Sequence, residues 1–133
     1  MKGNDMDLFS IEGKTALVTG GSRGIGLMIA RGYIEAGAKV YISSRKAAVC
    51  DQVAAELSEI GECISIPADL STEAECIRVA EAIAAQEDHL DILVNNAGAN
   101  WGAPLAEFPD AAWDRVLNLN VKGVFHLTKH LVP

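Results

Sequence analysis

Short apolar segments alternate along this chain with longer segments in which apolar residues recur every three or four positions. The short segments have the composition of strands, and the longer ones have the period of a helix with one buried face. Brief apolar strands alternating with helices are typical of a parallel sheet covered by helices on both faces. We therefore expect an α/β fold with a doubly wound parallel sheet. Strands are expected at 15–18, 40–43, 63–66 and 92–94, and helices at 25–36, 46–60, 72–86 and from about 109 onward.

The helical periods also predict which residues face the sheet. In the first expected helix, one face carries Ile25, Ile29, Gly32, Tyr33 and Ala36. In the second, one face carries Val49, Val53, Leu57 and Ile60. Gly37 and Gly61 follow these helices as stops, because glycine adopts the left-handed end conformation at little cost. The third helix is expected to open with a capping box from Thr72 to Glu75.

The composition argues against several classes of protein. With 11 basic and 18 acidic residues and a net charge of −7, the chain lacks the basic stripe that binds nucleic acid. No apolar run reaches the roughly 18 residues of a membrane span, and the acidic N-terminus does not resemble a signal peptide. Three cysteines without a CxxC pair favour free thiols in a reducing cytoplasm. We expect a cytoplasmic protein with one domain, residues 12–133, after an N-terminal extension, residues 1–11.

A glycine-rich stretch, residues 19–26, lies between the first expected strand and the first expected helix. It reads TGGSRGIG, a GxxxGxG spacing. Glycines let the backbone approach a ligand closely, and the free N–H groups at a helix start attract a diphosphate. The alternative is a tight strand-to-helix turn without a ligand. The position before a helix favours the dinucleotide site.

The end of the second expected strand, residues 42–46, reads ISSRK and contains no acidic residue. In dinucleotide folds, an acid about 20 residues after the glycines binds the ribose 2′-hydroxyl, whereas an arginine there accommodates a 2′-phosphate. Arg45 lies 25 residues after Gly20, and Arg23 could reach the same phosphate. The sequence thus favours NADP(H) over NAD(H). The alternative is that Arg45 and Lys46 only solvate a helix start, although cations there oppose the helix dipole.

Two further segments complete a set of motifs. NNAG at residues 95–98 follows the fourth expected strand, and WDRVLNLN occupies residues 113–120. With the glycine stretch, they resemble the motifs of the short-chain dehydrogenase/reductase family, over about Glu12 to Leu131. Residues 91–98 and 113–120 are most similar to the 3-oxoacyl-thioester reductase branch. The resemblance implies a Rossmann-type fold and NADPH-dependent reduction of a ketone, such as a 3-oxoacyl thioester, to a secondary alcohol.

The resemblance also implies roles for individual residues. Arg45 would bind the 2′-phosphate and Asp69 the adenine. Asn120 matches the Asn of the family's catalytic tetrad, which bends its helix and holds a water for proton relay. Asn95 is expected to be structural and to tie the fourth strand to its neighbour. The residues expected to bind NADP(H) are Gly20, Ser22, Arg23, Gly24, Ile25, Gly26, Ser44, Arg45, Asp69, Leu70, Asn96, Ala97 and Gly98.

The sequence departs from the family where the chemistry is done. The family uses a Ser, a Tyr that acts as general acid, and a Lys four residues after that Tyr. The chain has only Tyr33 and Tyr41, which are followed four residues later by Gly37 and Arg45. We therefore expect the cofactor-binding half of an enzyme, truncated after its fifth long helix and inactive alone. The rival hypothesis is a non-catalytic dinucleotide-binding sensor or scaffold.

Three smaller signals concern ligands and partners. His126 and His130 lie four residues apart, a spacing that suits two ligands of one metal ion, but no third ligand is evident. Surface or interface histidines and no metal site are expected. Trp101 either borders a substrate pocket or anchors a loop. The last helix is apolar on more than one side, and the family resemblance implies a homodimer or homotetramer.

Overall fold

The computed structural model describes residues 7–133, and these contain a four-stranded parallel sheet with the order β3-β2-β1-β4. The first two strands of the chain, β1 and β2, occupy the centre, and β1 pairs with both β2 and β4. The strands are β1 (Thr15–Thr19), β2 (Lys39–Ser43), β3 (Cys63–Ser65) and β4 (Ile92–Val94). All four predicted strands are therefore confirmed.

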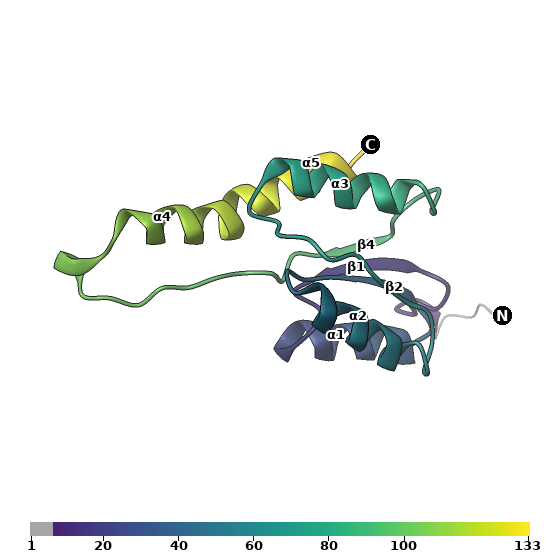
Figure 1. The fold of residues 1–133 in the computed structure, drawn as a ribbon. Helices are drawn as coiled ribbons and strands as arrows, with labels where there is room; N and C mark the ends of the chain where they lie inside the picture. Colours follow the sequence, from purple (N-terminus) through teal and green to yellow (C-terminus); the bar gives the residue numbers. More distant parts are fainter. Residues whose placement is uncertain (1–6) are drawn as a thin grey trace.

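Helices cover both faces of this sheet (Figure 1). On one face lie α1 (Gly24–Glu35) and α2 (Ala47–Leu57), and on the other lie α3 (Glu73–Ala84) and α5 (Val124–Leu131). The remaining elements are a short 3-10 helix η2 (Leu105–Glu107), α4 (Asp110–Leu117) and a π-helical segment η3 (Asn118–Gly123). Helices on both faces of a parallel sheet confirm the doubly wound, Rossmann-type fold.

The alternation of side chains along β1 and β2 divides the core into two clusters. Ala16 and Val18 belong to the cluster beneath α1 and α2, whereas Leu17 belongs to the cluster beneath α3 and α5. Every residue of β1 is buried. Successive side chains of a strand point to opposite faces, so the middle of a central strand covered on both faces must be apolar, as Ala16, Leu17 and Val18 are. This requirement explains why the strands were readable from sequence.

The predicted buried face of α1 is right in part: Ile29 and Tyr33 pack against the core, but the most buried positions lie one residue further along. The structure buries Gly26, Ala30 and Ile34, and Ile25 is 65% exposed. The predicted members Gly32 and Ala36 are also exposed. The cause is steric, because small residues let α1 approach the sheet more closely than a face of large apolar side chains would.

The predicted second helix is too long at its C-terminus. Its predicted face is right for Leu57, which is buried, and for Val53, which packs against the core, but not for the other two members. The buried residues of α2 are Cys50, Ala54 and Leu57, whereas Val49 and Ile60 are exposed. The helix ends at Leu57 because the next hydroxyl, Ser58 Oγ, bonds the carbonyls of both Ala54 (2.7 Å) and Cys63 (3.0 Å). The chain turns there toward β3, so Ile60 lies outside the helical period.

Other local predictions are confirmed in whole or in part. One half of the predicted capping box is present, because the Thr72 hydroxyl accepts the N–H of Glu75 (3.4 Å), but the Glu75 carboxylate accepts from Asp69 and Arg78 instead of the Thr72 N–H. The three cysteines, Cys50, Cys63 and Cys76, are free and buried. Burial raises the pKa of the Cys63 thiol to about 11, so this thiol stays protonated near neutral pH.

The last predicted helix is not continuous. Pro109 precedes it as the N-cap residue, and α4 and α5 are separated by the π-helical segment η3. Gly123, at the end of η3, lies close to the loop that joins β3 to α3. A Cβ at Gly123 would come within 2.5 Å of the carbonyl oxygen of Leu70 in that loop. This contact, and the hydrogen bonds of Asn120 described below, occur at the π-helical segment η3. Such π-helical turns within helices are frequent at functional sites.

Between residues 7 and 133, no helix is both long enough and apolar enough to cross a bilayer. Part of the predicted N-terminal extension, residues 1–6, lies outside the described residues, while Ile11 packs against the cluster beneath α1 and α2. The boundary at residue 12 remains a prediction.

Candidate functional site

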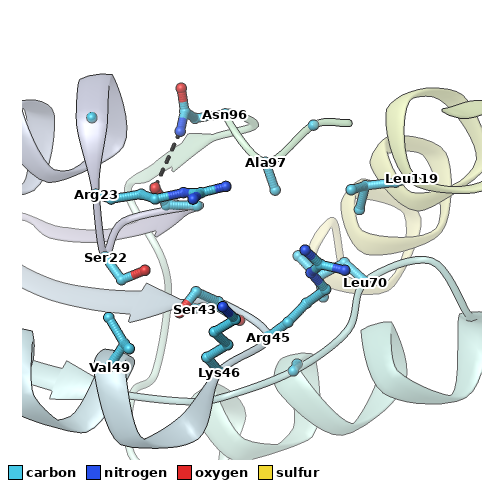
Figure 2. Close-up of a pocket in the computed structure, with 15 residues that line it drawn as sticks. Ser22, Arg23, Ser43, Arg45, Lys46, Val49, Leu70, Asn96, Ala97 and Leu119 are labelled. Carbon is cyan, nitrogen blue, oxygen red and sulfur yellow. Dashed lines mark hydrogen bonds between the residues drawn. The ribbon is translucent and has the colours of Figure 1, made fainter. Parts of the chain in front are cut away.

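A cavity of about 470 Å³ opens at the carboxyl ends of the strands (Figure 2). In doubly wound sheets, ligands bind at this edge. Most of the predicted cofactor-binding residues line it: Gly20, Ser22, Arg23, Gly24, Ser44, Arg45, Leu70, Asn96, Ala97 and Gly98. Sequence reasoning did not place five further lining residues in the site: Ser43, Lys46, Val49, Ala68 and Leu119. The predicted residues Ile25, Gly26 and Asp69 are not among the lining residues.

The glycine-rich loop presents backbone donors to this cavity. Gly20 (φ 65°) and Gly24 (φ 58°) adopt the left-handed conformation that favours glycine. Helix α1 begins at Gly24, and its N-cap residue Arg23 makes no side-chain capping bond. The first N–H groups of a helix have no partner within the helix and carry the positive end of its dipole. The loop is therefore suited to bind an anion.

Gly26 acts on the cavity indirectly. A Cβ at this position would overlap the carbonyl oxygen of Gly20 and come within 2.6 Å of Asn96 Nδ2. The absence of a side chain thus lets three segments meet: the loop after β1, the first turn of α1 and the end of β4. Gly26 shapes the wall of the cavity rather than forming its surface.

The hydroxyl of Thr19 joins the loops that follow β1 and β4. It donates to the carbonyl of Val94 (3.2 Å) and accepts the N–H groups of Asn96 and Ala97 (both 2.9 Å). Asn96 Nδ2 also donates to the Gly20 carbonyl (3.3 Å). This corrects the prediction for Asn95, whose side chain instead contacts Thr128 of α5 (3.3 Å). The residue that ties β4 to its neighbour is Asn96.

The end of β2 supplies two buried hydroxyls without a partner. Ser43 Oγ and Ser44 Oγ are buried and make no hydrogen bond to any residue between 7 and 133. Both residues line the cavity, and the Ser43 carbonyl already accepts the N–H of Gly20 (2.8 Å). An unpaired buried hydroxyl is costly, so such a pair at a cavity wall is suited to a polar ligand.

Cations flank these hydroxyls. Arg23 and Arg45 extend from opposite walls into the same space, and Lys46 follows Arg45 (Figure 2). Among residues 7–133, none that lines this cavity is acidic. Guanidinium and ammonium groups beside free hydroxyls and helix N–H groups match the acceptor oxygens of phosphates. The residues present therefore fit a ligand with phosphates on both sides of the cavity, as NADP(H) has.

Asp69 does not enter the cavity, although its neighbours Ala68 and Leu70 do. Its carboxylate accepts the N–H of Ser71 (3.1 Å), and its own N–H donates to Glu75 Oε1 (3.5 Å). Its contact with an adenine ring remains a prediction.

A second cavity, of about 550 Å³, adjoins the first and reaches Asn120. The Asn120 amide forms two bonds with one residue of the β4 loop: its Oδ1 accepts the N–H of Ala99 (2.8 Å), and its Nδ2 donates to the Ala99 carbonyl (2.7 Å). A side-chain amide that pairs with a backbone in this way fixes the loop against η3. The predicted bend of the helix at Asn120 agrees with η3, while its catalytic role remains a prediction.

Neither tyrosine lines either cavity. Tyr41 is buried and donates to Glu87 (2.6 Å), which also pairs with Lys39 (2.5 Å). Burial, then the bond to Glu87, raises the pKa of Tyr41 to about 12. A tyrosine that works as a general acid near neutral pH needs a pKa shifted in the opposite direction. Tyr33 packs against the core beneath α1 and α2.

The two histidines of α5 contact a carboxylate on α3. His130 lies 2.9 Å from Glu73 Oε2, His126 lies 4.0 Å from Oε1, and Lys129 lies 3.4 Å from Oε2. These contacts, the His130 hydrogen bond first, hold the pKa of Glu73 below its ordinary value. The cluster fastens α5 to α3.

The fold and the cavity together define a dinucleotide-binding protein of the Rossmann type. Residues 14–133 match the family model described as short chain dehydrogenase, and the chain belongs to this family. The resemblance inferred from the motifs is thereby confirmed.

Among curated relatives, the rhamnolipids biosynthesis 3-oxoacyl-[acyl-carrier-protein] reductase of Pseudomonas aeruginosa is 53% identical over 94% of this chain and 49% of the relative. The solved Pseudomonas aeruginosa RhlG/NADP active-site complex has a TM-score of 0.90 at 53% identity, over 94% of this chain and 49% of that one. The L-sorbose reductase of Gluconobacter frateurii, solved with NADPH and L-sorbose, has a TM-score of 0.89 at 32% identity, over 93% of this chain and 48% of that one. The chain spans about half the length of the relatives it matches.

Proposed function

We propose that this chain binds NADP(H) as the cofactor half of a short-chain reductase that converts a ketone to a secondary alcohol. A 3-oxoacyl thioester is the favoured substrate. The whole protein is proposed to act in the cytoplasm, as a homodimer or homotetramer. Similarity to the Pseudomonas aeruginosa reductase over nearly the whole chain supports the reaction and the substrate class.

One observation carries the cofactor proposal: the two unpaired buried hydroxyls of Ser43 and Ser44 lie in the same cavity wall as Arg45. A dianionic 2′-phosphate would accept hydrogen bonds from both kinds of group, and a carboxylate at the end of β2 would repel it. The N–H groups at the start of α1 and Arg23 would receive the pyrophosphate. Asn96, Ala97 and Gly98 would lie beside the nicotinamide ribose.

When bound, NADPH supplies the hydride, and this chain contributes its orientation. The Asn120–Ala99 bonds hold the wall of the second cavity, where a carbonyl substrate would lie next to the nicotinamide. The Ser, Tyr and Lys that the family uses would lie outside this chain. We therefore expect no NADPH oxidation when the purified chain is mixed with a 3-oxoacyl thioester, and measurable turnover would contradict this.

The cofactor proposal is tested by fluorescence titration of the chain with NADPH and NADH. Arg45→Asp should weaken NADPH binding at least tenfold and leave NADH binding nearly unchanged, because only NADPH carries the 2′-phosphate. Arg31→Asp, at an exposed position of α1 outside both cavities, is the matched control. An unchanged ratio of the two affinities in Arg45→Asp would refute the phosphate role.

The second candidate is a dinucleotide-binding protein without catalysis. The positions of Tyr33 and Tyr41, both outside the cavities, favour it for this chain taken alone. It predicts the same titration results but no reductase activity in the whole protein. Assay of the whole protein with NADPH and a 3-oxoacyl thioester therefore separates the two candidates.

A further inference from the structure

Arg115 contributes a cationic wall to the second cavity. This cavity shares Arg23 and Arg45 with the first and extends from them toward Asn120 and Arg115. Arg115 belongs to the last turn of α4, within the segment 113–120, and lies outside the glycine-rich stretch and the NNAG segment that were expected to bind the nucleotide.

The guanidinium of Arg115 is held in place but is not neutralised. It lies over the indole ring of Trp101, 5.7 Å from the ring centroid. Among residues 7–133 it makes no ion pair or hydrogen bond. Arg78, in contrast, bonds both carboxylate oxygens of Glu75 and the Pro67 carbonyl. Stacking on an indole leaves the donors at the edge of the guanidinium plane free for an acceptor.

The surroundings of Arg115 favour an anion. The chain has a net charge of −7, yet no acidic side chain between residues 7 and 133 lines this second cavity. Its polar walls consist of three arginines and the amides of Asn95, Asn100 and Asn120. Arginine forks and amide N–H groups bind phosphate or carboxylate oxygens in paired geometry.

The cofactor does not account for Arg115. The proposed NADP(H) places its 2′-phosphate near Arg45 and its pyrophosphate near Arg23 and the start of α1. Its nicotinamide end carries no anionic group beyond the pyrophosphate. An arginine on the Asn120 side of the site is therefore available to a second ligand.

We infer that Arg115, braced by Trp101, binds the phosphate or carboxylate of the carbonyl substrate, and that the substrate is an anionic carbonyl compound. The inference rests on the proposed function, since the second ligand is taken to be the substrate. It adds a specificity-determining residue on α4 to a site whose other cationic residues, Arg23 and Arg45, follow β1 and β2. Among the relatives, one is named for a substrate borne by an acyl-carrier protein and another was solved with L-sorbose, a neutral sugar; the inference places this chain with the first kind only if that substrate is anionic.

The test is calorimetric titration of the NADPH-saturated chain with three carbonyl probes. The probes are 3-oxobutyryl-coenzyme A, which carries phosphates, acetoacetate, which carries a carboxylate, and ethyl acetoacetate, which is neutral. Arg115→Gln should weaken binding of at least one anionic probe about tenfold and leave the neutral ester unchanged. The probe that loses affinity identifies the source of the anion. Arg31→Gln is the matched control and should alter none of the affinities.

Four results would overturn the inference. In the first, the parent and Arg115→Gln bind the anionic probes equally tightly. In the second, Arg115→Gln loses as much affinity for the neutral ester as for the anionic probes. In the third, the parent binds none of the probes, and in the fourth, Arg115→Gln binds NADPH itself more weakly than the parent does. The last would assign Arg115 to the cofactor. Failure of the proposed function looks different, because NADPH would then not bind the parent or would bind no more tightly than NADH. Trp101→Leu should weaken the same anionic probe by a smaller factor, since it removes only the brace.

Discussion

The sheet region and the arm formed by residues 99–123 are held together in different ways. In the sheet region, every residue of β1 is buried between two layers of helices. Along the arm, which extends away from the sheet, only Ala112 and Gly123 are buried among these described residues (Figure 1). The arm is fixed mainly where it returns to the sheet, through the Asn120–Ala99 bonds and the close contact of Gly123 with Leu70.

The buried sheet region gives the fold its stability, whereas the exposed arm shapes one side of the site. Burial of apolar surface stabilises the sheet region, so its cavity walls are set by packing. Along the arm and α5, Trp113, Leu117, Val121 and Phe125 are exposed at four-residue intervals. Substitutions in the sheet region should therefore change the free energy of unfolding, and those in the arm should change ligand binding.

The largest effect should come from truncating matched leucines in the two regions. Leu17 in β1 is 0% exposed and Leu117 in α4 is 42% exposed. Leu17→Ala should lower the free energy of unfolding by about 3–5 kcal/mol, because it removes contacts and leaves a cavity. Leu117→Ala should change it by no more than about 0.5 kcal/mol. Urea unfolding of both variants measures the difference, and equal losses would remove the distinction between the regions.

A pair of glycines in α1 sharpens the comparison within the sheet region. Gly26→Ala would push a methyl group into the Gly20 carbonyl, whereas a Cβ at Gly32 meets nothing within 4 Å. Gly26→Ala should cost about 1–3 kcal/mol and weaken NADPH binding at least tenfold, because the loop must move. Gly32→Ala should stabilise the chain by up to about 1 kcal/mol, with unchanged NADPH affinity. Thermal unfolding and NADPH titration test both, and tight NADPH binding by Gly26→Ala would argue against the close approach.

Alkaline pH should reveal the buried tyrosine. The pKa of Tyr41 is raised from 10.0 to about 12, so the unfolded chain ionises first and stability is lost as pH rises from 10 to 12. Over that interval the parent should lose about 2 kcal/mol more than Tyr41→Phe. The raised pKa of Lys39 acts in the same direction in both chains. Urea unfolding at pH 9 and at pH 11.5 measures the difference, and parallel losses would contradict the buried bond to Glu87.

The smallest effect is expected where α5 is fastened to α3. The pKa of Glu73 is lowered below its ordinary 4.5, chiefly by the hydrogen bond from His130. The ionised carboxylate therefore stabilises the folded chain above pH 4.5, and this stabilisation is lost as the pH falls through the pKa of Glu73 in the folded state. Glu73→Gln should slightly lower the melting temperature at pH 6, with no difference from the parent near pH 2. Glu35→Gln, at an exposed position of α1, is the control. A difference that persists in acid would mean that the carboxylate charge is not responsible.

The sequence predicted the strands and most of the cavity because both depend on local chemistry. A strand buried on both faces must be apolar, and a loop that presents its N–H groups needs glycine. The faces of α1 and α2 were predicted only in part, because the helices also pack through small residues such as Gly26 and Ala54, which carry little weight in a search for large apolar side chains.

Two features of the site depend on contacts too distant in sequence to be read locally. The Thr19 hydroxyl bonds backbone groups 75–78 residues away, and the glycine-rich motif that begins at Thr19 does not reveal these partners. The π-helical segment η3 coincides with the contact between Gly123 and Leu70. Ser43 was missed because its distinguishing property is a buried hydroxyl without a hydrogen-bond partner, and the sequence does not show which hydroxyls are left unpaired.

The strand order β3-β2-β1-β4 also bears on the time course of folding. During synthesis, the loop after β1 emerges early, but the carbonyl of Val94 that receives the Thr19 hydroxyl follows 75 residues later. Until β4 arrives, the nascent chain has the phosphate loop but not the opposite wall. Closing such a long loop slows folding, and a nucleotide that binds only the closed state would draw the equilibrium toward it. Of the four strands described, the one made last is thus the one that completes the pocket.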